Sequence, residues 1–134
     1  MTSTTGPNVQ QLIPILRSFD ETKAKEFYVE YLGFDVLFEH RFDDNAPLYF
    51  GLKLSSSNDI VLHLSEHHGD CTPGSTLRLH VEDIDALHAT LSAKEYKNAR
   101  PGIQDQPWGY REMKITDPFG NNLVFCQNIT KKEE

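Results

Sequence analysis

The chain has 134 residues, enough for one domain with a substantial core and too few for two ordinary domains. Hydrophobic residues make up 38% and charged residues 25%, a balance typical of globular proteins. The net charge of −7 disfavours nucleic acid as a partner, because neutralising phosphates requires a basic face, and no run of residues has the apolar length of a membrane span.

The two ends of the chain are polar. Residues 1–11 are predicted to form a flexible N-terminal arm and residues 129–134 a charged tail, which leaves 12–128 as a single domain. Residues 1–10 lack the charged, apolar and small-residue regions of a signal peptide, so we expect a cytoplasmic protein. In that compartment Cys71 and Cys126 are expected to be free thiols.

The first half of the domain is predicted to form a strand, a helix and three further strands. Residues 12–17 are a short apolar run with a proline, typical of a strand at a sheet edge. Asp20 is predicted to cap a helix that Gly33 ends. The apolar residues at helical spacing are Ala24, Phe27, Tyr28, Tyr31 and Leu32. The next three strands are expected at 34–42, 48–54 and 60–65, separated by the turn-forming clusters 43–47 and 55–59.

The same order then starts again. Residues 76–81 are predicted to form a strand, and Asp83 to cap a helix with Ile84, Leu87 and Leu91 on its apolar face. A loop with Trp108, a strand at 110–116, a turn at 117–121 and a strand at 122–127 complete the domain. The sequence therefore predicts an α+β fold of two tandem βαβββ modules, about 12–66 and 75–128, whose curved mixed sheets surround a concave cavity.

The single tryptophan lies in the loop sequence Gln106-Pro107-Trp108-Gly109. A loop bounded by proline and glycine is an unusual place to bury a large ring. We therefore interpret Trp108 as a flat, rigid surface for a planar ligand.

Two motifs carry a resemblance to a known family: Phe27-Tyr28-x-x-Tyr31-Leu32-Gly33-Phe34 and Asp117-Pro118-x-Gly120-Asn121. With them, residues 12–127 resemble the glyoxalase/bleomycin-resistance superfamily, also called vicinal oxygen chelate. Residues 13–16 and the tryptophan loop resemble its bleomycin-binding resistance proteins most closely. The resemblance implies a homodimer with two clefts at the subunit interface. A flat drug ring stacks on aromatic side chains there, and its cationic end meets an acidic surface.

The resemblance also implies four positions where metal-dependent relatives carry ligands. These positions fall on Ile13, His63, Thr76 and Val124, of which only His63 is a competent ligand. Because a catalytic metal normally takes about three protein ligands, we expect no metal, no cofactor and no catalytic residue. Residues 66–71 also hold His, Asp and Cys, but adjacent side chains of an extended segment point apart.

Alternation along the strands and the resemblance together indicate a set of ligand-binding residues. They are Trp108, Phe38, Phe42, His63, Ser65, Gly109, Tyr110 and Glu112. Two of them have a second interpretation: His63 either lines the cavity or contacts the ligand, and Glu112 either binds the ligand or lies on a solvated face.

The leading hypothesis is binding and sequestration of a bleomycin-type antibiotic, which confers resistance without chemical modification. The expected partners are a small planar cationic molecule and a second copy of the chain, with no nucleic acid and no membrane. His40 and Arg41 depart from this pattern, because an acidic stretch would suit a cationic drug better. The alternatives are a metal-dependent glyoxalase- or dioxygenase-like enzyme that uses His63 and a binder of another planar metabolite.

Overall fold

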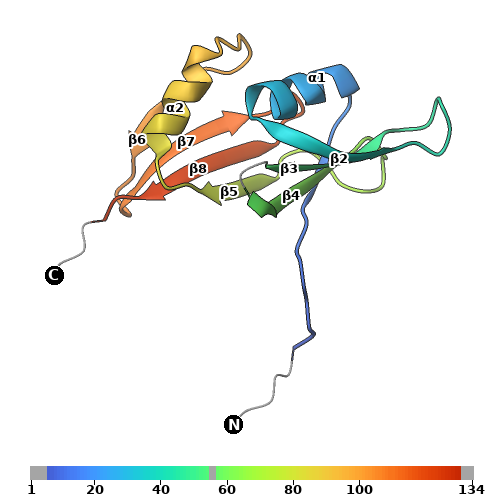
Figure 1. The fold of residues 1–134 in the computed structure, drawn as a ribbon, viewed down its shortest axis with the longest axis horizontal. Coiled ribbons are helices and arrows are strands. Elements are labelled where there is room, and N and C mark those ends of the chain that lie inside the picture. The colour runs from blue at the N-terminus through green and yellow to red at the C-terminus, as the bar shows by residue number, and fades with distance from the viewer. Residues whose placement is uncertain (1–5, 55–56, 131–134) are drawn as a thin grey trace.

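The computed structural model describes residues 6–54 and 57–130, which fold into two modules of the predicted order (Figure 1). The first module contains β1 (Ile15–Arg17), α1 (Glu21–Lys25), the π-helix η1 (Glu26–Tyr31), β2 (Phe34–His40), β3 (Tyr49–Leu54) and β4 (Ser57–Ser65). The second contains β5 (Thr76–His80), α2 (Ile84–Ala93), β6 (Ile103–Asp105), β7 (Tyr110–Thr116) and β8 (Asn122–Asn128).

Each module builds one mixed four-stranded sheet. Sheet A has the strand order β1-β4-β3-β2 and sheet B the order β5-β8-β7-β6. In each sheet the first strand runs parallel to the last, and the other neighbours are antiparallel. This arrangement confirms the predicted α+β fold of two tandem βαβββ modules.

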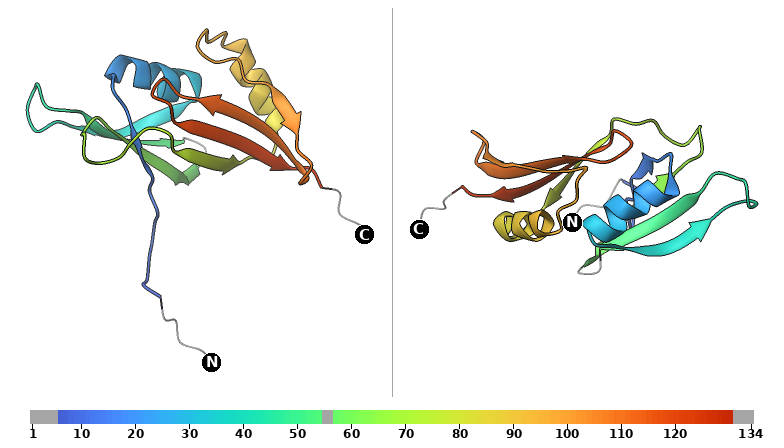
Figure 2. Two further views of the ribbon diagram at one scale, coloured as in Figure 1. Left: turned by 180° about the vertical axis from the view of Figure 1, so that it is seen from behind. Right: turned by 90° about the horizontal axis from the view of Figure 1, so that it is seen from above.

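The helices lie on one side of the two sheets. Figure 1 shows α1 and α2 above the strands, and the view from above in Figure 2 shows the modules side by side, each with its own helix. The side of each sheet turned away from its helix is called the open face below. Residues 6–12 lead away from the body on this side (Figure 1), with Val9 67% and Leu12 83% exposed, whereas the Pro14 carbonyl accepts a hydrogen bond from the amide of His63.

Both helices begin where the sequence predicts. The Asp20 carboxylate accepts a hydrogen bond from the amide of Lys23 at 3.0 Å, and Asp83 caps α2 in the same way through Ala86. Gly33 ends the first helix with a φ of 87°, a left-handed conformation that suits glycine. Residues 26–31 form a wider, π-helical turn instead of the expected α-helix, and three aromatic side chains of this segment lie in the core as their spacing predicts: Phe27, Tyr28 and Tyr31.

Several strand boundaries differ from the prediction. β1 has only three residues, and β2 ends at His40, just before Arg41, whose side chain donates a hydrogen bond to the carbonyl of Ala46. β4 begins at Ser57, inside the cluster predicted as a turn, of which residues 55–56 lie outside the described residues. β6 was not located in the sequence, since three residues are too short to show alternation.

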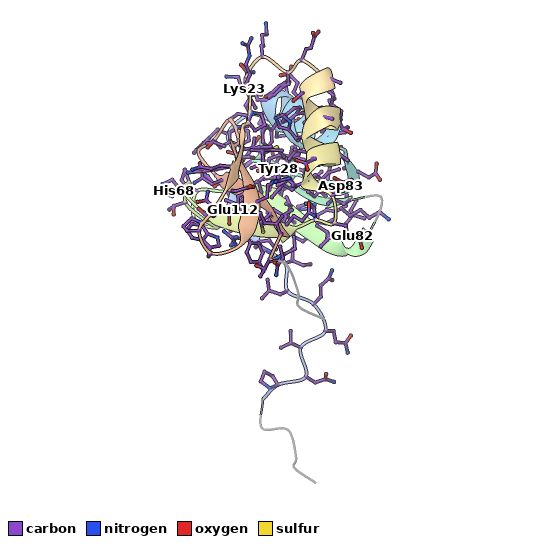
Figure 3. All side chains as sticks on the ribbon, turned by 90° about the vertical axis from the view of Figure 1, so that its left-hand side faces the viewer. Lys23, Tyr28, His68, Glu82, Asp83 and Glu112 are labelled. Atoms are coloured by element: carbon purple, nitrogen blue, oxygen red, sulfur yellow. The ribbon has the colours of Figure 1, made fainter. Side chains whose placement is uncertain are left out.

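A buried turn of the second module is tied to the first module. Asp117 accepts hydrogen bonds from the Tyr28 hydroxyl at 2.6 Å and from the amides of Phe119 and Asn121 at 2.8 Å. The Asn121 side chain also donates to the carbonyl of Arg17 in β1. Figure 3 shows Tyr28 well inside the molecule. Burial, and then the Asp117 carboxylate, raise the pKa of the Tyr28 hydroxyl, which therefore stays protonated and donates.

Parts of the predicted arm and tail, residues 1–5 and 131–134, lie outside the described residues. Among the residues described, no helix has the length and apolar character of a membrane span. Both cysteines, Cys71 and Cys126, are free thiols.

Candidate functional site

Three rings pack together on the open face of sheet A. The His63 ring centroid lies 5.2 Å from that of Phe38 and 5.3 Å from that of Tyr49, both in edge-to-face geometry. The three residues come from β4, β2 and β3, and the strand register sets them side by side. Phe38 remains 41% exposed, so this aromatic cluster (Phe38, Tyr49 and His63) offers a flat apolar surface.

Gly51 makes room for the aromatic cluster. It pairs with both Phe38 and His63 in the sheet, and a Cβ atom at this position would overlap Cε2 of Phe38. The same atom would lie 3.1 Å from Cδ2 of His63. The Phe38 ring therefore lies against the backbone of β3, an approach that a side chain at position 51 would block.

The His63 imidazole is held in place by its neighbours. Tyr49 Oη lies 2.7 Å from His63 Nδ1, and which of the two groups donates depends on the histidine tautomer. Burial lowers the pKa of His63, because the charged ring loses hydration there. The ring is therefore neutral at physiological pH, with one nitrogen left for a ligand or water.

The other two residues predicted for sheet A are not part of the aromatic cluster, although Ser65 pairs with Tyr49 in the sheet. Ser65 is fully buried, and its hydroxyl donates a hydrogen bond to Asp70 at 2.6 Å, which fixes the loop after β4. Phe42 follows the end of β2, is 78% exposed and packs edge-on against His40 and His67. In the part of the chain that the structure describes, no ring contact joins Phe42 to the aromatic cluster.

Trp108 lies in the tight loop that joins β6 to β7. The Gln106 amide donates to the carbonyl of Tyr110 at 2.7 Å and closes the loop. Gly109 has a φ of 88°, which glycine adopts without strain, and its carbonyl accepts a hydrogen bond from the amide of Ile129 at 2.9 Å. The loop is thus fixed to the chain after β8, while Trp108 remains 58% exposed.

Glu112 connects Trp108 to a residue that the sequence did not indicate. Its Oε2 accepts hydrogen bonds from Trp108 Nε1 at 3.0 Å and from Arg78 Nη2 at 2.6 Å. The hydrogen bond from Arg78, helped by that from Trp108, holds the pKa of the Glu112 carboxyl below its usual value. The Arg78 guanidinium carbon lies 6.0 Å from the ring centroid of Tyr110. These four residues, Trp108, Tyr110, Glu112 and Arg78, are called the tryptophan wall below.

Sequence reasoning missed Tyr49, Gly51 and Arg78. Alternation along β7 places Tyr110 and Glu112 on one face, and the structure has them there. Arg78, however, reaches Glu112 from β5, which lies next to β8 through a parallel pairing. Parallel pairing leaves no local sign in a sequence, whereas the alternation of β3 could have indicated Tyr49 and Gly51.

An apolar groove of about 450 Å³ lies next to the tryptophan wall, between the two modules. Most of its lining is aliphatic, and two polar residues of β5, Arg78 and His80, also line it. His80 packs edge-on against Tyr110, with 5.7 Å between ring centroids. The groove thus offers an apolar volume beside the aromatic and charged groups of the wall.

Within one chain, the aromatic cluster and the tryptophan wall lie on different sheets. No hydrogen bond, ion pair or ring contact joins the two sets in the described part of the chain. The structure therefore brings together Trp108, Tyr110 and Glu112, and separately Phe38 and His63, but not all of the predicted residues.

The surroundings of His63 do not fit a metal site. Its neighbour in β1 is Ile15, and the residues against its ring are Phe38 and Tyr49. In sheet B, Val124 is buried beside Arg78. Among the described residues, no group of three or more His, Cys, Asp and Glu side chains is close enough to hold one ion.

Comparison with known proteins places this fold and these motifs in one family. The model of the glyoxalase superfamily proteins matches residues 2–132, so the chain belongs to that superfamily. It is 27% identical to a bleomycin resistance protein of Geobacillus stearothermophilus, over 89% of this chain and 97% of the relative.

Two solved structures show the same architecture. A glyoxalase-related enzyme from Clostridium phytofermentans is 27% identical, with a TM-score of 0.74 and coverage of 94% of this chain and 100% of its own. TnmS3, an antibiotic binding protein from Streptomyces sp. CB03234, is 25% identical, with a TM-score of 0.67 and coverage of 92% and 99%.

Proposed function

We propose that this protein binds a flat antibiotic of the bleomycin type and sequesters it without chemical change. Similarity to a bleomycin resistance protein and to an antibiotic binding protein supports binding and resistance at the level of the family. The observation that carries the proposal is Trp108, which is anchored through its indole N–H to Glu112 and yet keeps 58% of its surface exposed.

An anchored and exposed ring is prepared for stacking. Its orientation is set before the ligand arrives, so little conformational entropy is lost on binding. A ring stacked on Trp108 contributes about 0.5–1.5 kcal/mol beyond the area it buries. Burial of roughly 200–300 Å² of apolar ligand surface adds about 5–7 kcal/mol before association costs. Micromolar affinity therefore requires no covalent chemistry.

We further propose that two copies of the chain build each binding site. The aromatic cluster and the tryptophan wall face a ligand from different sheets, and a dimer would let the cluster of one chain oppose the wall of the other. Residues 6–12 lead away from the body with Val9 and Leu12 exposed, as expected of a segment that packs on a partner. In this proposal Phe42 and Ser65 do not contact the ligand and only support the loops beside the binding site.

Sequestration and modification are distinguished by the fate of the drug. Purified protein is mixed with bleomycin, DNA cleavage by the mixture is measured, and the drug is released by denaturing the protein and analysed by mass spectrometry. We expect inhibition in proportion to the protein added, an unchanged drug mass and full cleavage activity after release. The proposal would be contradicted if far less than one protein molecule per drug molecule abolished DNA cleavage, or if the released drug had an altered mass.

One observation favours an enzyme as the second candidate. The neutral His63 ring is hydrogen bonded to Tyr49 on the open face of sheet A, a pair suited to proton transfer, and one structural relative is described as a glyoxalase-related enzyme. Metal analysis of protein purified without a histidine tag tests the metal-dependent version. Stoichiometric zinc, nickel or iron lost in His63→Gln would support it.

A further inference from the structure

We infer that Arg78 sets the charge preference of the tryptophan wall: it recognises an acidic group on a flat ligand and disfavours a cationic group at the same place. This inference rests on the proposed function, because it concerns a ligand stacked on Trp108. It names a specificity residue and a ligand class that the sequence pattern did not indicate.

The only carboxylate on the open face of sheet B, within the described residues, is already paired. Glu112 receives the Arg78 guanidinium at 2.6 Å and the Trp108 indole N–H at 3.0 Å on the same oxygen. Its side chain is 11% exposed, whereas that of Arg78 is 45% exposed. A ligand cation would therefore have to displace Arg78 in order to reach Glu112, and the outer charge of the pair is positive.

The remaining charges on this face point to the same ligand chemistry. By strand register the face also carries Lys114, which pairs with Val124 and is separated by that residue from Arg78. The open face thus has two permanent cations and one carboxylate, although the whole chain has a net charge of −7. The acidic character of the chain lies elsewhere, so it does not make this wall a site for cations.

Arg78 retains hydrogen-bonding capacity for an acidic group. A guanidinium has five N–H groups, of which Glu112 engages one on Nη2, and the guanidinium also meets the side chain of Cys126, so further N–H groups remain for a ligand. Arg78 also lines the apolar groove, and its guanidinium lies above the Tyr110 ring. A planar ligand in contact with these groups would place a carboxylate or another oxyanion within reach of the free N–H groups, a geometry that guanidinium binds well.

At the place where a ligand ring meets Arg78 we therefore expect an acidic group, so the cationic end of a bleomycin-type drug would lie away from this residue. Three probes with one ring system test the charge preference by calorimetry near neutral pH: acridine-9-carboxylate, neutral acridine and 9-aminoacridine, which is a cation. The variants are Arg78→Gln, which removes the charge, Arg78→Lys, which keeps it, and Lys114→Gln, which removes the other cation of the same face.

In the wild type we expect acridine-9-carboxylate to bind at least about tenfold more tightly than 9-aminoacridine, whose charge is delocalised over the protonated ring. Arg78→Gln should reduce this ratio at least about tenfold, while neutral acridine changes less than about threefold. Arg78→Lys and Lys114→Gln should keep most of the preference. The role of Arg78 would be overturned if Arg78→Gln left the affinity ratio of the carboxylate to the cationic probe unchanged, or if the wild type bound the cationic probe more tightly.

The design separates this inference from the proposed function. Suppose that neutral acridine binds the wild type but not Trp108→Ala, and that Arg78→Gln leaves the affinity ratio of the carboxylate to the cationic probe unchanged. The inference about Arg78 is then rejected, while stacking on Trp108 still stands. Binding that Trp108→Ala does not weaken rejects the proposed wall itself. Failure of all three probes to bind the wild type overturns the inference, whereas the proposed function is decided by the titration with bleomycin.

Discussion

At the scale of single residues, the open face of sheet A depends on a missing side chain. Gly51 lets the Phe38 ring lie on the backbone of β3 and against His63. The sequence shows a glycine within a strand, which usually weakens it, but the close approach of Phe38 supplies the reason. Tyr49 then completes the cluster through its hydrogen bond to His63.

Gly51→Ala should weaken ligand binding more than it weakens the fold. The new methyl group would displace the exposed Phe38 ring, so we expect a loss of affinity of about three- to tenfold, the equivalent of one lost ring contact. Calorimetry with bleomycin measures the affinity, and urea unfolding measures the stability. Gly102→Ala is the matched control, because a Cβ atom there meets nothing within 4 Å. Equal affinities in both variants would show that Phe38 does not contact the ligand.

His63 should make stability depend on pH. Burial lowers its pKa in the folded state, so the unfolded chain binds more protons as the pH falls below about 6.5. The contribution of neutral His63 to the free energy of unfolding is therefore complete above that pH. It is lost as the pH falls toward the lowered pKa that His63 has in the folded state. Urea unfolding at a series of pH values from neutral to mildly acidic gives the free energy of unfolding, which should fall more steeply for the wild type than for His63→Gln. The exposed His68, changed to Gln, is the control, and equal slopes for wild type and His63→Gln would contradict the prediction.

At the scale of elements, the sequence predicted helix boundaries that depend on nearby residues, but it did not predict contacts between residues far apart in the chain. The caps Asp20 and Asp83 and the stop at Gly33 depend on neighbours within a few residues, so the sequence predicted them correctly. The Arg78–Glu112 ion pair spans 34 positions and follows from the neighbourhood of β5 and β8. The short β6 and the widened turn of η1 also depend on packing against the rest of the fold.

The turn between β7 and β8 should contribute more to stability than its length suggests. Asp117→Ala would leave the buried Tyr28 hydroxyl and two buried amides without their acceptor. Each such group costs about 1–3 kcal/mol, so we expect a loss of at least about 3 kcal/mol in the free energy of unfolding. Tyr28→Phe should lose only about 1 kcal/mol, because Asp117 keeps its other donors. Urea unfolding followed by circular dichroism measures both, with the exposed Asp44→Ala as control.

At the scale of the whole molecule, the candidate binding residues fall into two sets that one chain does not join. The fold was predictable, because its order of elements repeats and its motifs carry a family resemblance. The site was predictable only in part: Trp108, Tyr110 and Glu112 lie together, whereas Ser65 is buried and Phe42 lies in a loop. Strand register and burial decide such placements, and a single sequence states neither of them.

The proposed dimer should depend on the segment before β1. Val9 and Leu12 are apolar side chains that one chain leaves mostly exposed, with Leu12 at the edge of the apolar groove, so the double change to serine should weaken association. Light scattering over a range of concentrations should give twice the mass of a chain for the wild type and a shift toward the single-chain mass for the variant. A wild type of single-chain mass at all concentrations would remove the dimer from the account.

The most direct test of the central claim uses Trp108 itself, since it is the single tryptophan of the chain. Its fluorescence is followed while metal-free or copper-loaded bleomycin is added, and calorimetry repeats the titration with Trp108→Ala. The account predicts saturable quenching at about one drug per chain, and an affinity at least about tenfold weaker in the variant. Unchanged fluorescence at a large excess of both forms of the drug would contradict it.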